Sequence, residues 1–429
     1  MKVALVGYGY WGRNVLKALI KQNLAYKAYQ ARGAGGHDAD DVDNADLAES
    51  KSARDSKNRA DFTKSTHNAE SKSTPESTAL DFEIIGVYDT DMAQCLAAAS
   101  DYQALIQEGT ESIKTKTRAN STKSNPPESA FAESTLLDSA PNQSALHIYP
   151  TFEDLLADEC VEAVFIITPP QTHYTLAKRA LQARKHIFVE KPLATSLKEC
   201  AELYALASKL GLIVHCDHIF LYAPAVEWLK RHLAIFGEVL YVQARRINLG
   251  LFQNSVDVIW DLALHDLSIL DYLWGLDVRS HHTLRTQYQG FDALADIHLE
   301  LKNASANINA NISANINANI SVSWLSPIKV REMMIGGAKK TAIYDETKSE
   351  KLAIFDCGIV VQDVAKDSLY RQMVQYHLGE VSHPTLPKIL PLERSIYDFY
   401  AQIKAKRMRA WLTEHTLRVV GALERISSK

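Results

Sequence analysis

The sequence predicts an α/β protein that begins with a doubly wound parallel sheet, and three observations lead to this prediction. The first 14 residues read as strand, glycine turn and helix. Short apolar runs then alternate with segments of helical periodicity as far as about residue 218, which is typical of a parallel sheet. The length of 429 residues is enough for two domains.

The glycine turn follows the apolar strand Val3–Val6 in the spacing G-x-G-x-x-G. Gly7 permits a tight turn, Gly9 lets the backbone approach a pyrophosphate, and Gly12 lets the helix pack on the strand. A glycine-rich turn without a ligand is the alternative, but the strand before it and the helix after it favour a Rossmann dinucleotide site. We therefore expect the cofactor to contact Gly7, Tyr8, Gly9, Tyr10, Trp11 and Gly12.

The composition gives no reason to expect a nucleic acid or a membrane as partner. The chain has 47 Lys and Arg against 51 Asp and Glu, a net charge of −4. No run of 18 apolar residues is present, and the apolar N-terminal run is too short for a signal peptide. Five cysteines without CxxC spacing argue against a disulfide framework or a zinc site, so we expect a cytoplasmic protein.

Two segments contain few large apolar residues, Ala31–Leu80 and Gln107–Ala145. Neither can bury enough apolar surface to offset the entropy lost on ordering. We predict that both are disordered or loosely attached insertions in the first domain. A docking segment that folds on a partner remains the alternative.

The second predicted strand, Phe82–Asp89, ends in an acid. With the 50-residue first insertion set aside, Asp89 follows Gly12 by 27 residues. This is compatible with the acid about 20 residues after the glycine turn that binds the adenosine ribose in a dinucleotide site. Thr90 and Asp91 come next. Because a 2′-phosphate would meet negative charge there, the sequence favours NAD over NADP.

Two further strands, Ala163–Ile167 and His186–Val189, end in residues suited to ligand binding. Ligands of such sheets lie at the carboxyl ends of the strands. A lysine at that edge points into the crevice, although a solvated surface ion pair is the ordinary interpretation of an isolated Glu-Lys. We expect cofactor contacts from Thr168, Pro169, His173, Glu190 and Lys191.

These motifs together resemble the glucose–fructose oxidoreductase / inositol dehydrogenase / MocA family. The similarity lies in GYGYWG, the TPPxxH turn at 168–173, VEKPL at 189–193 and the pair Asp261-x-x-x-His265. It implies an NAD-binding Rossmann domain over residues 1–218 and an α+β domain over 219–429. In this family the second domain has an open, mostly antiparallel sheet that covers the active site and often mediates oligomers, so a homodimer or homotetramer is expected.

A polar stripe on the apolar helix predicted over Val258–Trp274 contains Asp261 and His265. A lone histidine there is usually a satisfied core residue. An acid four residues earlier and the resemblance both favour a catalytic pair, with His265 as base and Asp261 fixing its tautomer. Lys191 is the other candidate base, and the sequence does not decide between them. His215 and His218 would fall on opposite strand faces, so no metal site is expected.

The regular tract 306–321 alternates apolar residues with Asn or Ser and predicts a half-buried strand. After it, the C-terminal segment 391–426 predicts helices that pack back on the sheets.

Candidate substrate residues lie on two predicted strands of the second domain. Segments 245–253, 256–270 and 323–331 resemble family members that oxidise UDP-linked N-acetyl sugars at C3 on the way to amino-sugar glycans such as lipid A. A diphosphate needs forked cationic donors, which a free inositol would not use. We therefore expect UDP-N-acetylglucosamine to be held by Arg246, Asn248, Lys329 and Arg331. An inositol or monosaccharide dehydrogenase and a non-catalytic dinucleotide sensor are the alternatives.

Overall fold

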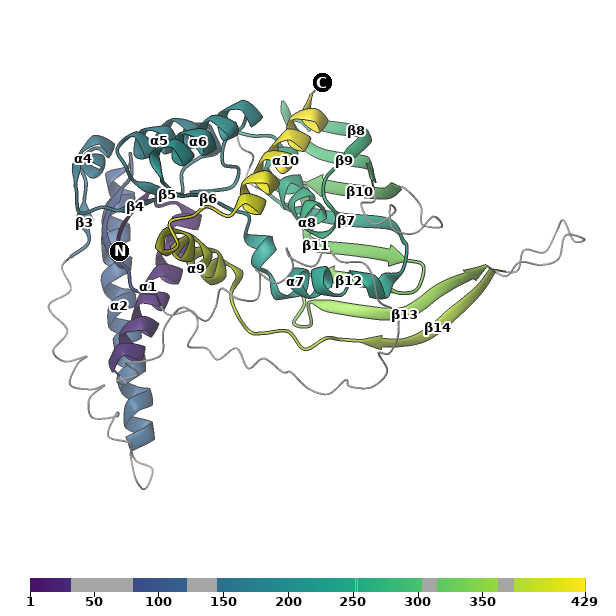
Figure 1. Ribbon diagram of the computed structural model, residues 1–429, viewed down its shortest axis with the longest axis horizontal. Coiled ribbons are helices and arrows are strands. Elements are labelled where there is room, and N and C mark those ends of the chain that lie inside the picture. The colour runs from purple at the N-terminus through teal and green to yellow at the C-terminus, as the bar shows by residue number, and fades with distance from the viewer. Residues whose placement is uncertain are drawn as a thin grey trace, which may run out of the picture. The chain divides into compact units, whose positions relative to one another are not determined.

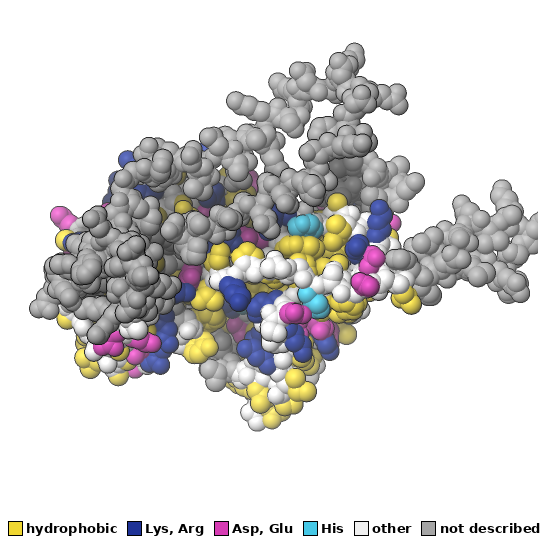
Figure 2. Space-filling view, turned by 90° about the horizontal axis from the view of Figure 1, so that it is seen from below, with side chains coloured by type: hydrophobic (Ala, Val, Ile, Leu, Met, Phe, Trp, Pro, Cys, Tyr) yellow, Lys and Arg dark blue, Asp and Glu magenta, His cyan; other side chains and the backbone are white. Residues whose placement is uncertain are grey.

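The computed structural model describes residues 1–31, 80–121, 145–250, 252, 254–302, 315–361 and 374–428. These form two compact units, and everything that follows concerns the first unit unless stated otherwise: Met1–Leu19, Phe82–Asp101 and Leu146–Lys429. No helix in the described part of the chain has the length and hydropathy needed to cross a bilayer. On the face seen in Figure 2, basic and acidic side chains lie close together among hydrophobic ones, in keeping with the balanced composition.

The first sheet has six parallel strands in the order β3-β2-β1-β4-β5-β6, the doubly wound arrangement that the sequence predicts. Its strands are β1 (Lys2–Val6), β2 (Glu83–Tyr88), β3 (His147–Ile148), β4 (Ala163–Ile166), β5 (His186–Glu190) and β6 (Val214–Asp217). The helices that alternate with them are α1 (Tyr10–Ala31), α2 (Met92–Ser121), α4 (Phe152–Ala157), α5 (Pro170–Gln182) and α6 (Leu197–Leu210). The central strands β4 and β5 are almost entirely buried, because helices cover both faces of the sheet.

The second sheet has eight strands in the order β14-β13-β12-β11-β7-β10-β9-β8. They are β7 (Val239–Leu249), β8 (Val278–Tyr288), β9 (Phe291–Lys302), β10 (Asn315–Ser323), β11 (Leu325–Gly337), β12 (Thr341–Asp345), β13 (Leu352–Val361) and β14 (Val374–Ser382). All neighbours are antiparallel except β10 and β7, which are parallel. The expected open, mostly antiparallel sheet is therefore confirmed.

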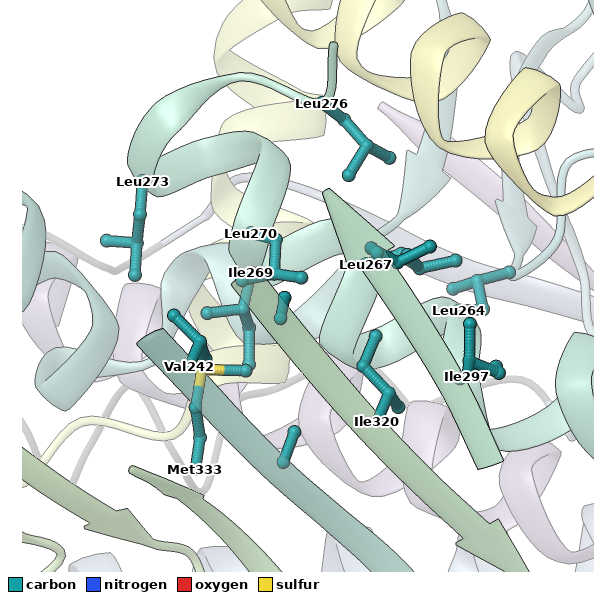
Figure 3. Packing of buried hydrophobic residues seen from close by; sticks show 14 of the residues in the cluster. Val242, Leu264, Leu267, Ile269, Leu270, Leu273, Leu276, Ile297, Ile320 and Met333 are labelled. Carbon is teal, nitrogen blue, oxygen red and sulfur yellow. The ribbon is translucent and has the colours of Figure 1, made fainter. Parts of the chain in front are cut away.

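The core of this second part lies between the sheet and one apolar helix, α8 (Leu264–Trp274). Figure 3 shows strand side chains such as Val242 and Ile320 close to side chains of α8 such as Leu267, Ile269 and Leu270. In β10 the even-numbered residues from 316 to 322 are buried, so the predicted alternation is confirmed for the described part of the tract. Residues 303–314 lie outside the described residues.

The predicted helix over Val258–Trp274 begins with a π-helical turn, Ile259–Ala263, before α8. The short elements η3 (Ile219–Tyr222), α7 (Pro224–Arg231) and η4 (Leu233–Phe236) follow β6. The C-terminal helices are α9 (Pro391–Lys404) and α10 (Ala410–Ser427). Figure 1 shows α9 below the first sheet, where Phe399 contacts Phe165 and Phe188 of β4 and β5. These helices pack back on the sheets, as predicted.

The insertion predicted from Gln107, disordered or loosely attached, is helical in its first part. Helix α2 continues to Ser121, and the stretch from Gln107 includes Gln, Ala, Arg, two Glu and two Lys, which are good helix formers, beside three Thr and one Gly, which are not. Within the second unit, the Thr110 hydroxyl donates to the Ile106 carbonyl at 2.8 Å along the helix. The remainder, 122–144, and most of the first predicted insertion, 32–79, lie outside the described residues.

Candidate active site

The glycine turn between β1 and α1 has the geometry of a phosphate cradle. Gly7 has a φ of +93°, and a Cβ there would lie 2.6 Å from the Ile167 carbonyl oxygen. A Cβ on Gly12 would lie 2.6 Å from the Gly7 carbonyl oxygen, so helix and turn pack at a distance that only glycine allows. A Cβ on Gly9 would meet no atom within 4 Å. The one glycine expected to face the pyrophosphate therefore faces open space at the start of a helix, which fits a dinucleotide.

Asp89 follows β2 and lies beside this turn. Its Oδ2 accepts a hydrogen bond from the Tyr8 backbone N–H at 2.7 Å, and its Oδ1 accepts one from the Asp91 N–H at 2.9 Å. The carboxylate is thus fixed at the edge of the cradle, where the sequence places the ribose-binding acid.

The three aromatic side chains of the turn separate into two groups. Tyr8 is buried, and its hydroxyl donates to Asp101 Oδ2 at 2.8 Å, so its side chain is a core residue and only its backbone borders the cradle. Tyr10 and Trp11 are 82% and 45% exposed and remain available to a cofactor. The predicted contact of Tyr8 with the cofactor would therefore involve its backbone.

His173 lies in the first turn of α5 and is completely buried. Its Nδ1 is 2.7 Å from the Pro192 carbonyl oxygen, and its Nε2 is 2.7 Å from the Thr168 carbonyl oxygen. The imidazole therefore ties the loop after β4 to the loop after β5 and does not face a ligand. Thr168 and Pro169, by contrast, lie at the carboxyl edge of the sheet, where the Thr168 hydroxyl bonds that of Thr172 at 2.7 Å.

Lys191 extends from the end of β5 to the π-helical turn of the second part of the chain. Its Nζ donates to the Asp261 backbone carbonyl at 2.8 Å and to Asp261 Oδ1 at 3.2 Å. The other carboxylate oxygen, Oδ2, accepts a hydrogen bond from the Trp324 indole N–H at 3.0 Å. The Lys191 side chain is only 14% exposed, so this ion pair is partly shielded from water.

Glu190 lies beneath this lysine, opposite Asp217 in the β5–β6 register. Both carboxyl groups are buried, and burial raises the pKa of each, while repulsion by Asp217 raises the pKa of Glu190 further. Asp217 Oδ1 also accepts a hydrogen bond from the Ser395 hydroxyl at 2.6 Å. Glu190 Oε2 also accepts a hydrogen bond from the Lys191 backbone N–H at 3.2 Å, so this carboxyl group lies at the start of the Lys191 loop, and its contact with the cofactor stays a prediction.

His265 lies one turn beyond Asp261 but does not contact it. Its ring packs edge-to-face on Phe220, with centroids 4.8 Å apart. Within the described residues, neither of its ring nitrogens makes a hydrogen bond. Burial lowers the pKa of His265 well below its usual value, and the positive charges of Lys191 and Arg246 lower it further. The imidazole is therefore neutral, and its nitrogens have no partner in the described residues. The predicted orientation by Asp261 is wrong, since that carboxylate is bound to Lys191 and Trp324.

Arg246 does not have the open position expected of a diphosphate ligand. It is 3% exposed, and its guanidinium bonds both oxygens of Asp266 at 3.0 Å. Its Nη2 is also 2.9 Å from Glu346 Oε1, and its plane lies over the Phe220 ring at 4.6 Å. The prediction for Arg246 is corrected: its Nε and Nη2 donors are bound to buried carboxylates.

Arg331 is the cross-strand neighbour of Arg246 in the β7–β11 register and differs from it in pairing. Its Nη2 donates to Asn248 Oδ1 at 2.9 Å, while its buried Nη1 has no hydrogen-bond partner. Within the described residues, its guanidinium forms no ion pair. Lys329, two residues earlier on β11, is exposed. The structure thus brings Arg331 and Asn248 together, near enough to His265 for the arginine's charge to lower its pKa, and leaves the arginine with unused donors.

Sequence reasoning assigned no role to three residues that shape this site: Phe220, Trp324 and Asp266. Gly250 is a further one, because a Cβ there would lie 2.3 Å from Trp324 Cδ1. One signal was present, since Trp324 continues the buried even-numbered positions of β10 and a buried indole N–H needs an acceptor. No comparable sequence signal identifies Phe220 or Asp266.

Comparison with known proteins adds a family and several relatives. A family model described as "Oxidoreductase family, NAD-binding Rossmann fold" matches residues 1–218. Among curated proteins, UDP-N-acetylglucosamine 3-dehydrogenase of Acidithiobacillus ferrooxidans is 36% identical over 138 residues, 31% of this chain and 42% of the relative. The NAD(+)-dependent scyllo-inositol 2-dehydrogenase of Bacillus subtilis is 29% identical over 134 residues, 30% of this chain and 39% of the relative. The aligned sequence thus spans about two fifths of the length of these relatives.

Likeness in structure extends over the whole chain. The solved structure of UDP-N-acetylglucosamine 3-dehydrogenase from A. ferrooxidans aligns with a TM-score of 0.60 at 19% identity, covering 99% of this chain and 96% of that one. At this identity the alignment speaks for the shared fold, including the second sheet that lies beyond the matched family model.

Proposed function

This chain belongs to the oxidoreductase family with an NAD-binding Rossmann fold, and from this premise we propose that it is an NAD-dependent dehydrogenase that oxidises a sugar hydroxyl to a ketone. One observation carries the proposal. A neutral, unbonded imidazole, His265, lies close to a carboxylate-bound ammonium group, Lys191, at the carboxyl edge of the sheet whose glycine turn fits a dinucleotide.

In this proposal the residues of the chain divide the work. Bound NAD⁺ supplies the acceptor for the hydrogen and electron pair that leave the carbinol carbon. His265 takes the hydroxyl proton, because its ring nitrogens have no hydrogen-bond partner in the described residues, and its lowered pKa keeps the ring unprotonated although it also makes it a weaker base. Lys191 directs two of its contacts to Asp261, which leaves a donor for the substrate oxygen. This geometry favours His265 over Lys191 as the base.

For the substrate we propose UDP-N-acetylglucosamine, oxidised at C3 to a ketone that a later amination could use. The name of one relative supports the choice. So does Arg331, a half-buried guanidinium without a carboxylate partner in the described part of the chain, which suits the diphosphate of a UDP-sugar. Lys329 and Asn248 stand on the same two strands and would complete that site, whereas Arg246 is left out.

An inositol or monosaccharide dehydrogenase is the second candidate, and the scyllo-inositol 2-dehydrogenase relative supports it. A free inositol or monosaccharide has no anionic group that the Arg331 guanidinium would bind. A non-catalytic dinucleotide sensor is the third candidate, but a protein without turnover would not need Lys191 and His265 in its site.

The test is NADH formation at 340 nm with purified protein, using UDP-N-acetylglucosamine, UDP-glucose, myo-inositol and glucose in parallel. We expect turnover with UDP-N-acetylglucosamine and NAD⁺, and less with NADP⁺. Turnover of myo-inositol or glucose without turnover of UDP-N-acetylglucosamine would overturn the substrate assignment. If no compound is turned over, the result favours a sensor.

We further propose that the protein works in the cytoplasm as a homo-oligomer. All five cysteines are free thiols, which a reducing compartment preserves. Large apolar side chains are exposed on several strands of the second sheet, including Tyr241, Leu284 and Tyr288. Light scattering on the purified protein at micromolar concentration tests the assembly, and a monomer would contradict it.

A further inference from the structure

His218 leaves β6 at the same edge of the sheet at which Lys191 leaves β5. The last paired residues of these neighbouring parallel strands are Glu190 and Asp217, and the two side chains in question belong to the residues that follow. His218 is therefore in the place where this fold binds its ligands, at the carboxyl ends of adjacent strands.

The imidazole of His218 is 2% exposed, and neither Nδ1 nor Nε2 has a hydrogen-bond partner in the described residues. Its nearest aromatic neighbour is His415, edge-to-face with centroids 4.7 Å apart. His415 cannot satisfy it, because the nitrogens of His415 are bound to Asp271 Oδ2 at 2.6 Å and to Ser268 Oγ at 2.9 Å.

The other buried histidines show how this chain treats an imidazole that serves only the core. The described residues include three more that are almost completely inaccessible, and in each one both nitrogens have a partner: His173, His215 and His415. Leaving buried polar atoms unpaired costs about 1–3 kcal/mol. A phenylalanine would fill the space of His218 without that cost. The exception therefore indicates a partner that is not part of the polypeptide.

The chemistry of the ring limits what that partner is. Burial lowers the pKa of His218, and the charge of Lys191 lowers it further, so the ring is neutral with one donor and one acceptor nitrogen. A hydroxyl group also has one donor and accepts through its oxygen, so it matches a neutral imidazole in either tautomer. An anion would accept from the one N–H of the neutral ring and leave its acceptor nitrogen unpaired, so it would satisfy only half of the imidazole.

We propose that His218 is a substrate-binding residue that holds a second hydroxyl of the sugar, next to the hydroxyl that is oxidised. This inference rests on the proposed function, since it needs a polyhydroxylated substrate between Lys191 and His265. It assigns the residue to substrate recognition and not to the proton transfer itself.

The test compares full-length His218→Phe with wild type and with His281→Phe, the same change at an exposed position of β8. Initial rates with UDP-N-acetylglucosamine give KM and kcat, calorimetry gives the Kd of NAD⁺, and thermal unfolding gives Tm. We expect the KM of His218→Phe to rise about tenfold, the worth of one lost hydrogen bond of about 1.4 kcal/mol. Its Kd for NAD⁺ should change less than twofold, and its Tm should equal or exceed that of wild type, because an unpaired polar group has been removed.

Every other outcome is decisive. A KM within twofold of wild type overturns the inference while the proposed function stands, and so does a rise in the Kd of NAD⁺ with an unchanged KM, which would make His218 a cofactor contact. A fall in Tm by several degrees would show a structural role. His218→Asn, which keeps a donor and an acceptor, should recover part of the lost affinity. If wild type oxidises none of the sugars, the proposed function fails first and the inference with it.

Discussion

Replacing Arg246 by alanine should damage stability more than substrate binding. The substitution removes a cation that is 3% exposed and leaves Asp266, which is 2% exposed, without its two hydrogen bonds of 3.0 Å. It also removes the ion pair with Glu346 at 2.9 Å. Breaking a buried ion pair from one side costs about 3–5 kcal/mol, because the remaining charge stays uncompensated. We expect a loss of that size in the free energy of unfolding.

Arg245→Ala is the matched control, since the neighbouring side chain is 57% exposed and pairs with Glu332 at 3.1 Å on the other face of β7. An exposed pair of this kind contributes about 0.2–1 kcal/mol. Urea unfolding of both variants measures the difference, and initial rates at a temperature where Arg246→Ala is still folded measure KM. The reasoning is refuted if Arg246→Ala loses less than about 1 kcal/mol while its KM for UDP-N-acetylglucosamine rises, because the arginine would then bind substrate.

Four further predictions concern the site and its surroundings. Asp89→Ala should raise the Kd of NAD⁺ and narrow its preference over NADP⁺, measured by calorimetry; an unchanged ratio would remove Asp89 from the ribose site. Lys191→Ala and His265→Ala should each lower kcat by about 10²-fold or more, and near-normal turnover would exclude that residue from proton transfer. Arg331→Ala should raise the KM for UDP-N-acetylglucosamine with less effect on kcat, and an unchanged KM would contradict a diphosphate contact. Burial lowers the pKa of His215 from 6.5 to about 4, so between those two pH values only the unfolded chain binds this proton, and stability falls as the pH falls. Wild type should therefore lose about 1.4 kcal/mol per pH unit more than His215→Gln in urea titrations; equal slopes would show that His215 is charged in the folded protein.

The sequence predicted those features that depend on local pattern. The glycine turn, the strand that ends before Asp89 and the buried alternation of β10 are all set by residues close together in the chain. Lys191 and Asp261 were predicted to belong to one site, but the sequence did not predict that they contact each other. Their hydrogen bond depends on the π-helical turn, which periodicity with a 3.6-residue repeat does not reveal.

Arg246 shows why the remaining part could not be predicted. On β7 it reads as a cation on a strand face, and nothing in the local sequence shows that Asp266 of α8 lies against that face. The pairing arises only when helix and sheet pack, so a buried structural arginine and a ligand-binding arginine look alike in sequence. Arg331, its cross-strand neighbour, has the same local pattern and a different set of partners.

The bond from Lys191 to the backbone of Asp261 has a consequence for how this enzyme tolerates change. One of the two acceptors of the ammonium group is a main-chain carbonyl, 2.8 Å away, and no side-chain substitution at position 261 deletes it. Asp261→Asn would remove the charge but keep this acceptor, so the lysine should stay aimed at the same point while its electrostatic surroundings change. Substitution at position 261 would then change the charge beside Lys191, and so its reactivity, while the backbone hydrogen bond keeps the ammonium group in place. Related proteins could therefore differ in the reactivity of this lysine without a change in its position.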